Sequence, residues 1–397
     1  MYKYRLTILV LSQFFCTSLW FAGNSAIENT QHANDSVLLG HLSSAVQAGF
    51  IIGTFFYALF AIADRYSPSH VFFWSSLLAS LSNLLLIYPS LPLEGLLTFR
   101  FLTGFFLAGI YPVGMKIAVD HYESDLGKPM GFIVGALVMG TATPHLLKSI
   151  NLEAVTANIV VCTSVLAVVG GLTTLLFVDN GPFRKKTEIL KFDSFFQSFR
   201  SREFRTIMFG YIGHTWELYA FWSCVPQILL IYADQHKQHS LNLPILSFLI
   251  IACGSIGCIV SGYTSRKFDS KKFATFLLLS SAICCLLSPF VLNVESIVLL
   301  VTFLMLWNIF AVSDSPLFSR LMAENAPRHA RGAALTIANC LGFSVTIISI
   351  QLTSNLLKIT GSHYVFLLIA IGPLFGIISL LMKNFGKNTN LPSKNLS

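Results

Sequence analysis

The segment RFLTGFFLAGIYPVGMKIAVD, residues 100–120, is an apolar run that ends with Pro112, Lys116 and Asp120. The same pattern returns 204 residues later as Pro316, Arg320 and Glu324. A weak internal repeat between two halves of a chain is typical of secondary transporters that are built from two helical bundles. We therefore expect this segment and its copy to occupy equivalent places, each at the inner end of a membrane span.

A second pair of segments supports the repeat. Residues Ala63-Asp64-Arg65 stand 202 positions before Ser265-Arg266-Lys267. Either match alone can arise by chance, but two matches at nearly the same offset argue for two related halves.

The composition is that of a membrane protein. The 397 residues are 54% hydrophobic and only 11% charged, whereas about 25% is usual for soluble proteins. Apolar runs long enough to span a bilayer recur along the whole chain. All eight cysteines fall inside apolar runs without zinc-site spacing, so we interpret them as packing residues. Residues Met1–Ala26 also resemble a signal peptide, but the many later spans favour a retained first span.

Twelve candidate spans follow one another, mostly with short polar connections between them. Their predicted starts are near Leu6, His41, His70, Gly95, Pro129, Val155, Arg205, Pro244, Phe273, Ile297, Gly332 and His363. The longest connection runs from Asp179 to Arg205. We therefore predict an N-terminal six-helix bundle over residues 1–183, a cytoplasmic linker over residues 184–204 and a C-terminal six-helix bundle over residues 205–397.

The positive charges predict the orientation. Of the 26 Lys and Arg residues, three fall in outer loops when the N-terminus is inside: Lys148, Lys237 and Lys358. Arg100 lies within a span, and the other 22 lie on the inner side, which is the asymmetry of the positive-inside rule. The net charge of +8 is therefore a topology signal, and no nucleic-acid partner is expected. Both termini are expected in the cytoplasm, with the chain in the inner membrane of a bacterial cell.

These motifs resemble the major facilitator superfamily over essentially the whole chain. The stretch Ile62-Ala63-Asp64-Arg65 is similar to the family signature between spans two and three. The chain departs from that signature at three positions: Phe60, Ser67 and Pro68. Arg100 followed by Gly104 is similar to the second signature, in span four, which is often linked to proton movement. The resemblance implies an all-α membrane protein with twelve transmembrane helices in two pseudo-symmetric six-helix bundles.

Three segments resemble one bacterial subgroup of mostly unassigned transporters, loosely labelled nitrate/nitrite-like: RFLTGFFLAGIYPVGMK, GHTWELYAFW and VSDSPLFS. Nitrate carriers of the family use arginines in spans two and eight, whereas the arginine that lies well inside a span here is Arg100. Span five also lacks the Gly-Pro pair of the exporter signature and reads instead Gly131, Gly135, Gly140 and Pro144. This departure favours uptake over efflux.

Ionisable residues inside a span are costly and mark functional candidates. Glu217 is the deepest, since it lies 12 residues after Arg205, or about 18 Å into a core about 30 Å thick. Its neighbours Tyr211, His214 and Phe221 are spaced to share its helical face. We predict Glu217 as the proton-coupling acid, because burial favours its neutral form, and His214 as its modulator. The alternative is a structural pair with a neighbouring helix.

Arg100 and Asp314 each allow more than one interpretation. Arg100 either clamps an anionic group of the substrate with its planar fork, or holds helices together through buried hydrogen bonds. Asp314, which precedes Pro316, either contacts protons or substrate, caps broken backbone, or forms a gate pair with a base such as Lys116.

Further polar and aromatic residues lie at depths where a substrate cavity is expected. The predicted substrate-binding set is Arg100, Trp20, Asn24, Gln47, Tyr111, His145, Trp216, Tyr219, Asn308 and Asn339. The predicted inner gate is Asp64, Arg65, Arg266 and Lys267. Taken singly, each of these residues is more often part of a helix–helix hydrogen bond than a ligand contact.

These features favour a secondary active transporter. The sequence holds no Walker motif, so gradients rather than ATP are expected to drive transport. A solute sensor would need an added signalling region, and a membrane enzyme would need clustered histidines and acids near one face. Proton-coupled uptake of a small polar or anionic organic solute, of siderophore or carboxylate type among others, leads over proton-driven efflux of amphipathic compounds. The expected partners are that solute, protons and the lipid bilayer, for a monomer without cofactor or metal.

Overall fold

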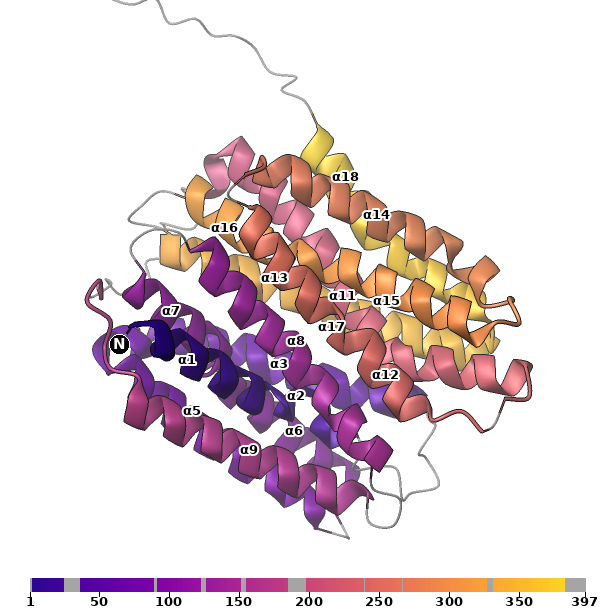
Figure 1. Ribbon diagram of the computed structural model, residues 1–397, viewed down its shortest axis with the longest axis horizontal. Coiled ribbons are helices and arrows are strands. Elements are labelled where there is room, and N and C mark those ends of the chain that lie inside the picture. The colour runs from indigo at the N-terminus through magenta and orange to yellow at the C-terminus, as the bar shows by residue number, and fades with distance from the viewer. Residues whose placement is uncertain are drawn as a thin grey trace, which may run out of the picture.

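The computed structural model describes a helical chain, and no strand occurs within the ranges it covers (Figure 1). Those ranges are residues 2–24, 36–88, 91–122, 126–150, 155–184, 198–238, 240–265, 267–326 and 331–382. Most of the predicted linker, residues 185–197, and the predicted gate residue Arg266 lie outside them.

The helices form two consecutive groups along the chain. The N-half consists of α1 (Tyr2–Thr17), α2 (Leu19–Ala22), α3 (Ser36–Leu59), α4 (Ile62–Arg65), α5 (Pro68–Leu84), η2 (Leu85–Ile87), α6 (Leu93–Leu107), α7 (Tyr111–His121), α8 (Gly127–Ile150) and α9 (Val155–Phe177). The C-half consists of α11 (Arg202–Gln235), α12 (Leu243–Ala252), α13 (Gly254–Thr264), α14 (Ser270–Val291), α15 (Ile297–Ser313), α16 (Ser315–Asn325), α17 (Arg331–Thr360), η3 (His363–Ala370) and α18 (Ile371–Leu381). The described helices begin close to the predicted span starts, and the largest difference is α3, which begins at Ser36 rather than near His41.

Eleven candidate membrane spans occur among the described residues, by length and apolar composition. Helix α11 is not one of them, although it has 34 residues and so extends about 51 Å. It carries polar residues in its middle, among them His214 and Glu217, which lower its hydropathy. The chain is thus a multi-pass membrane protein, and the seventh predicted span, which starts near Arg205, coincides with this longest and more polar helix.

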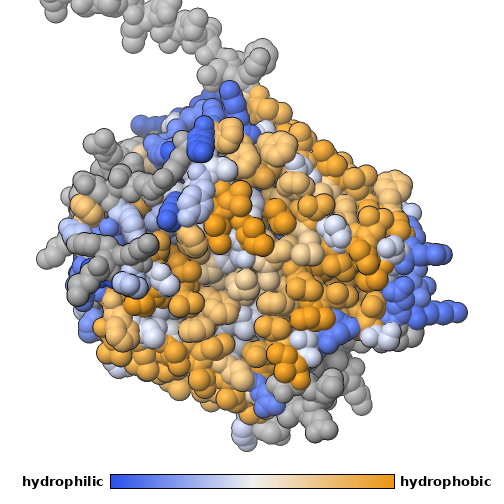
Figure 2. All heavy atoms as spheres, in the orientation of Figure 1, coloured by the Kyte–Doolittle hydropathy of each residue, from blue (hydrophilic) through white to orange (hydrophobic). Residues whose placement is uncertain are grey.

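The molecular surface matches a bilayer environment. Apolar side chains cover the middle of the face seen in Figure 2, and hydrophilic side chains gather toward the helix ends. Large apolar residues such as Ile256, Phe276 and Ile348 are more than half exposed. A soluble monomer rarely exposes such a continuous apolar surface, whereas a membrane protein presents it to lipid.

Spans four and ten are broken at equivalent positions. Span four is interrupted at residues 108–110, between α6 and α7, and span ten at Asp314, between α15 and α16. Pro112 and Pro316 lie in the first turn of the helix that follows each break, where the missing N–H of proline breaks no helical hydrogen bond. The chain therefore restarts a helix at two places 204 residues apart, in agreement with the repeat.

The two halves meet along two seams, α3 with α17, and α8 with α12 and α13 (Figure 1). In the second seam, a Cβ added to Gly131 of α8 would lie 2.8 Å from the main-chain oxygen of Cys258 in α13. A Cβ added to Gly262 would lie 2.9 Å from Cα of Gly131. Small residues let membrane helices approach this closely. The close approach of α8 and α13 therefore requires glycine at both positions.

Candidate functional site

Glu217 lies in a closed pocket inside the C-half. It comes from the middle of α11, is fully buried, and is held by side chains of α14 and α15. Trp307 Nε1 donates to Glu217 Oε1 at 2.7 Å, and Ser281 Oγ lies 2.8 Å from Oε2. Cys285 Sγ donates to Oε1 at 3.3 Å. The groups that hold this acid are all uncharged.

Ser281 lets the pocket hold Glu217 in either protonation state. Its single hydroxyl hydrogen has two acceptors within reach, Glu217 Oε2 at 2.8 Å and the main-chain oxygen of Leu278 at 3.0 Å. When Glu217 is ionised, the hydroxyl donates to the carboxylate. When Glu217 is protonated, the acid donates to Ser281, which then donates to Leu278. Rotation of one hydroxyl group therefore keeps Oε2 of Glu217 hydrogen-bonded in either state.

His214 and Asp314 form a second buried pair, one helical turn closer to the start of α11. His214 Nδ1 lies 2.7 Å from Asp314 Oδ1, and both side chains are buried. The other ring nitrogen, Nε2, lies 2.8 Å from Ser315 Oγ. Asp314 thus occupies the break in span ten and pairs with His214. In the described structure it does not pair with Lys116, whose ammonium lies 2.8 Å from Asp64 in the other half.

Helix α11 turns two different faces to its surroundings. The face with Glu217 turns toward α14–α16, where Phe221 packs against Trp307 with ring centroids 4.5 Å apart. The opposite face carries Tyr219, because a separation of two residues is about 200° around a helix. The titratable groups therefore lie inside the C-half, and an aromatic ring lies at the boundary between the halves.

Aromatic rings from both halves close on one another at this boundary. Trp20 of α2 stacks on Tyr219 of α11, with ring centroids 5.7 Å apart and an interplanar angle of 28°. Phe50 of α3 and Phe343 of α17 lie beside them, with centroids 4.6 Å apart. Trp20 and Tyr219 are predicted binding residues. Phe50 and Phe343 escaped prediction, because a phenylalanine in an apolar span carries no distinguishing signal.

Arg100 of α6 is fully buried and binds the main chain of α2. Its guanidinium donates to the main-chain oxygen of Leu19 at 3.1 Å and also to that of Trp20. Helix α2 begins after α1 ends, so these carbonyl groups lie near an interruption of span one. These bonds match the prediction that Arg100 holds helices together through buried hydrogen bonds, which was the alternative to a clamp on the substrate. They also fix the backbone that carries the Trp20 ring.

Asn308 joins three helices of the C-half. Its Nδ2 donates to the main-chain oxygens of Ile250 and Ile251 at 2.9 and 2.8 Å, close to the end of α12. Its Oδ1 accepts from Trp222 Nε1 at 2.8 Å. The side chain is therefore engaged in packing α11, α12 and α15 together.

The other predicted binding residues have varied surroundings. Trp216 donates its indole N–H to the main-chain oxygen of Leu368 at 3.1 Å. Asn24 donates to Ser43 Oγ at 3.2 Å, and Gln47 is fully buried in α3. Three more side chains are half-buried: Tyr111, His145 and Asn339. The predicted set thus divides between the aromatic boundary and the interiors of the two halves.

Of the predicted inner gate residues, Asp64 has a charged partner in its own half. Lys116 of α7 lies 2.8 Å from Asp64 of α4. At the equivalent place in the C-half, Arg320 of α16 donates to the main-chain oxygen of Ser265 at 2.7 Å. In each half, the segment that carries the repeat at offset 202 is therefore tied to the helix after the break, through Asp64 in the N-half and Ser265 in the C-half. The other predicted gate residues have exposed side chains or lie outside the described ranges: Arg65 and Lys267 in the first case, Arg266 in the second.

The three groups that hold Glu217 are not among the predicted site residues. A single serine, cysteine or tryptophan in an apolar span is ordinary, so nothing in the chain marks Ser281, Cys285 or Trp307. One usable signal is that Ser281 and Cys285 lie four residues apart, on one face of a helix. That pattern indicates a polar strip facing a neighbour, although it does not say which neighbour.

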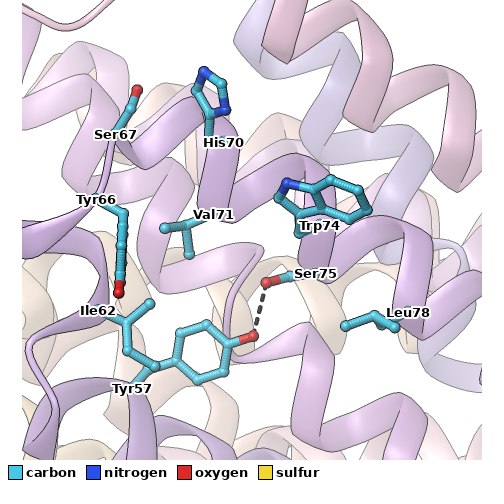
Figure 3. A pocket seen from close by; sticks show the side chains of 9 residues that line it. All are labelled: Tyr57, Ile62, Tyr66, Ser67, His70, Val71, Trp74, Ser75 and Leu78. Atoms are coloured by element: carbon cyan, nitrogen blue, oxygen red, sulfur yellow. Dashed lines mark hydrogen bonds between the residues drawn. The ribbon is translucent and has the colours of Figure 1, made fainter.

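A separate groove opens on the surface of the N-half between α3 and α5 (Figure 3). It has a volume of about 580 Å³ and is lined by Tyr57, Ile62, Tyr66, Ser67, His70, Val71, Trp74, Ser75 and Leu78. The hydroxyl groups of Tyr57 and Ser75 lie 2.7 Å apart in it. Within the described part of the chain, its lining shares no residue with the predicted site.

Comparison with known proteins agrees with this architecture. A family profile described as Major Facilitator Superfamily matches residues 6–350. The crystal structure of a mutant of the nucleoside transporter NupG aligns with a TM-score of 0.71 and 13% identity, over 96% of this chain and 98% of that one. A mutant of the E. coli fucose:proton symporter FucP aligns with a TM-score of 0.67 and 14% identity, over 96% and 98%. No curated protein matches the sequence significantly. At these identities the likeness concerns the fold alone.

Proposed function

The chain belongs to the major facilitator superfamily, and from this premise we propose that it is a proton-coupled transporter that takes up a small polar organic solute by alternating access. Its family makes it a secondary transporter rather than an enzyme. A sensor that binds solute without moving it finds no support in the family or in the fold. Uptake is favoured over efflux by span five, which lacks the exporter signature.

The observation that carries proton coupling is the pocket around Glu217. A fixed charge at this depth is costly, whereas an acid that alternates between neutral and ionised forms bears that cost only part of the time. Ser281 supplies a hydrogen bond to either form of Glu217, and Trp307 and Cys285 hold the same carboxyl group. Glu217 can therefore take up a proton while open to one side and release it to the other.

We assign His214 and Asp314 to the path between Glu217 and the inner side. His214 lies three residues before Glu217 on α11, which is about 4.5 Å along the helix. Its Nδ1 lies 2.7 Å from Asp314 Oδ1, and Ser315 Oγ lies 2.8 Å from the other ring nitrogen. The pair thus offers a second station for a proton, next to the break in span ten.

We propose that α11 also spans the membrane, as the seventh span in chain order, which brings the total to twelve. Its length exceeds what the membrane core requires, and the ionisable groups in its middle, His214 and Glu217, are buried by the C-half rather than exposed to lipid. The resulting domains are a six-helix bundle over residues 1–183, a linker over residues 184–204 and a six-helix bundle over residues 205–397. With both termini in the cytoplasm, the chain acts as a monomer in a bacterial inner membrane.

We assign Arg100 to positioning and the Lys116–Asp64 pair to the inner gate. Arg100 holds the backbone of Leu19 and Trp20, and so orients the Trp20 ring at the boundary between the halves. Lys116 and Asp64 brace the inner end of the N-half, as Arg320 does for the C-half. These contacts keep each half rigid while the two halves rock against each other.

Metabolite comparison of cells with and without the protein tests this function and identifies the solute. Cells that make the protein are expected to contain more of the transported solute than cells that lack it. Proteoliposomes loaded with the protein should then accumulate the same solute when the interior is alkaline. A protonophore should abolish that accumulation, and accumulation that survives the protonophore would contradict proton coupling.

A further inference from the structure

The N-half presents buried polar atoms along its boundary with the C-half. Within the described ranges, no hydrogen-bond partner reaches Trp20 Nε1, Asn24 Oδ1 or either amide atom of Gln47. Trp20 is 1% exposed and Gln47 is 0% exposed. Burial without a partner costs a polar group its hydration, so native structures rarely leave such groups unsatisfied without a reason. A ligand that arrives at this boundary would supply the missing partners.

The neighbours of Gln47 on α3 show which part of the boundary it faces. It is one helical turn from Ser43 and one from Phe50 along α3, so the three residues share a face. Ser43 accepts from Asn24 at 3.2 Å, and Phe50 packs against Trp20 with ring centroids 5.0 Å apart. Gln47 therefore lies on α3 between the residue that meets Asn24 and the residue that meets Trp20.

The C-half covers this strip with aromatic rings. Tyr219 stacks on Trp20, and Phe343 lies 6.0 Å from Trp20 and 5.1 Å from Tyr219, measured between ring centroids. Trp20 and Tyr219 are nearly parallel and belong to different halves. When the halves part during alternating access, these two ring faces separate and a flat or ring-shaped molecule fits between them.

The groups that meet at this boundary are uncharged. They comprise an indole N–H, a carboxamide, a side-chain amide oxygen and aromatic faces. Of the nearby charges, Glu217 faces α14 and α15, whereas Arg100 donates two N–H groups to the main chain of α2 and its Nε has no hydrogen-bond partner among the described residues. A cationic ligand would therefore find no carboxylate here among the described side chains, and an anionic ligand would meet Arg100 only across the backbone of Leu19 and Trp20.

We propose that this boundary binds an uncharged ring compound that carries hydrogen-bond donors and acceptors at its edge. The ring lies between Trp20 and Tyr219. Gln47 donates to and accepts from the edge, and Asn24 Oδ1 accepts from it. Trp20 Nε1–H, which points out of the stack in the plane of the indole, donates to a substituent of the ring that extends past the indole edge. The inference rests on the proposed function, because only rocking of the two halves opens the aromatic stack. It narrows the substrate to a neutral class in place of an anion.

Two sources share this chemistry, a heterocyclic base and a sugar ring. The purified full chain in lipid nanodiscs is titrated with uracil, uridine and D-glucose, and with the matched anions orotate, uridine 5′-monophosphate and D-glucuronate. Quenching of tryptophan fluorescence reports binding. We expect one neutral member to bind and its anion to bind at least about tenfold more weakly, as loss of complementarity predicts. Binding of an anion as tightly as its neutral partner, or of no neutral compound, overturns the proposal.

Gln47→Leu separates a binding role from a structural one. Replacement of an unpartnered buried amide by an apolar side chain of similar size should leave the melting temperature unchanged or raise it. The same change should weaken binding of the neutral probe at least about tenfold. Gln13→Leu is the matched control, because Gln13 is also fully buried without a described partner but faces Gly114 inside the N-half. Its binding should stay at the wild-type level.

A second variant isolates the indole donor. Trp20→Phe keeps an aromatic face but removes Nε1–H, and should weaken neutral-probe binding, which is measured by calorimetry because the variant lacks the stacked tryptophan. The smaller ring also leaves space in the core, so some loss of stability is expected and binding is compared below the melting temperature of the variant. Unchanged binding in Gln47→Leu, or a lowered melting temperature in that variant, overturns the assignment of Gln47. Tight anion binding together with proton-gradient-driven accumulation would defeat this inference and leave the proposed function standing.

Discussion

His214 Nδ1 lies 2.7 Å from Asp314 Oδ1, with both side chains buried inside the C-half. By the offset of 204 residues, the position equivalent to Asp314 in the N-half is Ile110, a buried apolar residue at the break in span four. The two breaks are therefore alike in backbone and different in chemistry. The break in the C-half thus carries a histidine–carboxylate pair, whereas the break in the N-half carries an apolar residue.

Asp314→Ala should lower stability and abolish proton-driven accumulation. It leaves His214 buried without its carboxylate, and removal of one member of a buried pair costs about 3–5 kcal/mol. Thermal unfolding in detergent measures the loss. Asp179→Ala is the control, since Asp179 pairs with Arg5 at the surface at 2.6 Å, where such pairs contribute only about 0–1 kcal/mol. Equal melting temperatures for the two variants would contradict a buried pair.

Glu217→Gln should separate binding from coupling. The amide keeps the shape of the acid and can still bond to Ser281 and Trp307, but it cannot release a proton. Counterflow exchange of the solute is expected to persist, while accumulation driven by a pH gradient falls at least about tenfold. Undiminished accumulation would sink the coupling role. Equal loss of exchange and accumulation would make Glu217 a substrate ligand instead.

Arg100→Lys should lower the melting temperature and weaken neutral-probe binding. A lysine keeps the charge but lacks the planar fork that reaches the carbonyl groups of both Leu19 and Trp20. Loss of a buried hydrogen bond that leaves its partner unsatisfied costs about 1–3 kcal/mol. Wild-type stability and binding in this variant would exclude both the positioning role and the anion clamp.

Gly131→Val should hold the halves apart at their second seam. A Cβ at Gly131 lies 2.8 Å from the main-chain oxygen of Cys258, so a branched side chain has no room. Cys258 is fully buried in the wild-type chain. We expect a membrane-permeant maleimide, followed by mass spectrometry, to label Cys258 in the variant and not in the wild type. Transport should fall at the same time, and a labelling rate that does not change would speak against a tight seam.

A reporter fused after Ser393 tests the orientation. Because 22 of the 26 basic residues lie on the predicted inner side, a reporter that works only in the cytoplasm should be active there. A second fusion after Lys237 should report the opposite side, since that residue lies in a predicted outer loop. Activity of the first fusion only in the periplasm would reverse the topology.

The positions of the spans could be read from the chain because the bilayer leaves few choices. A long apolar segment in lipid must satisfy its own backbone hydrogen bonds, so it forms a helix. Pro112 and Pro316 likewise predict where spans four and ten resume as helices, since the first turn of a helix does not need the N–H that proline lacks. A span starting near Arg205 is predicted for α11 as well, although His214 and Glu217 reduce its apolar signal below that of the other eleven candidates.

The amino-acid sequence was enough to identify a multi-pass membrane protein, to predict two related halves and to predict Glu217 as the deepest acid. What each polar residue contacts became known only from the packing of the helices. Ser281 and Trp307 meet Glu217 from 64 and 90 residues away, and Arg100 meets the backbone of Trp20 from 80 residues away. Helical periodicity says which residues share a face. It does not say which helix that face meets. Packing between distant segments decides whether a buried group binds the main chain, uncharged side chains or a ligand.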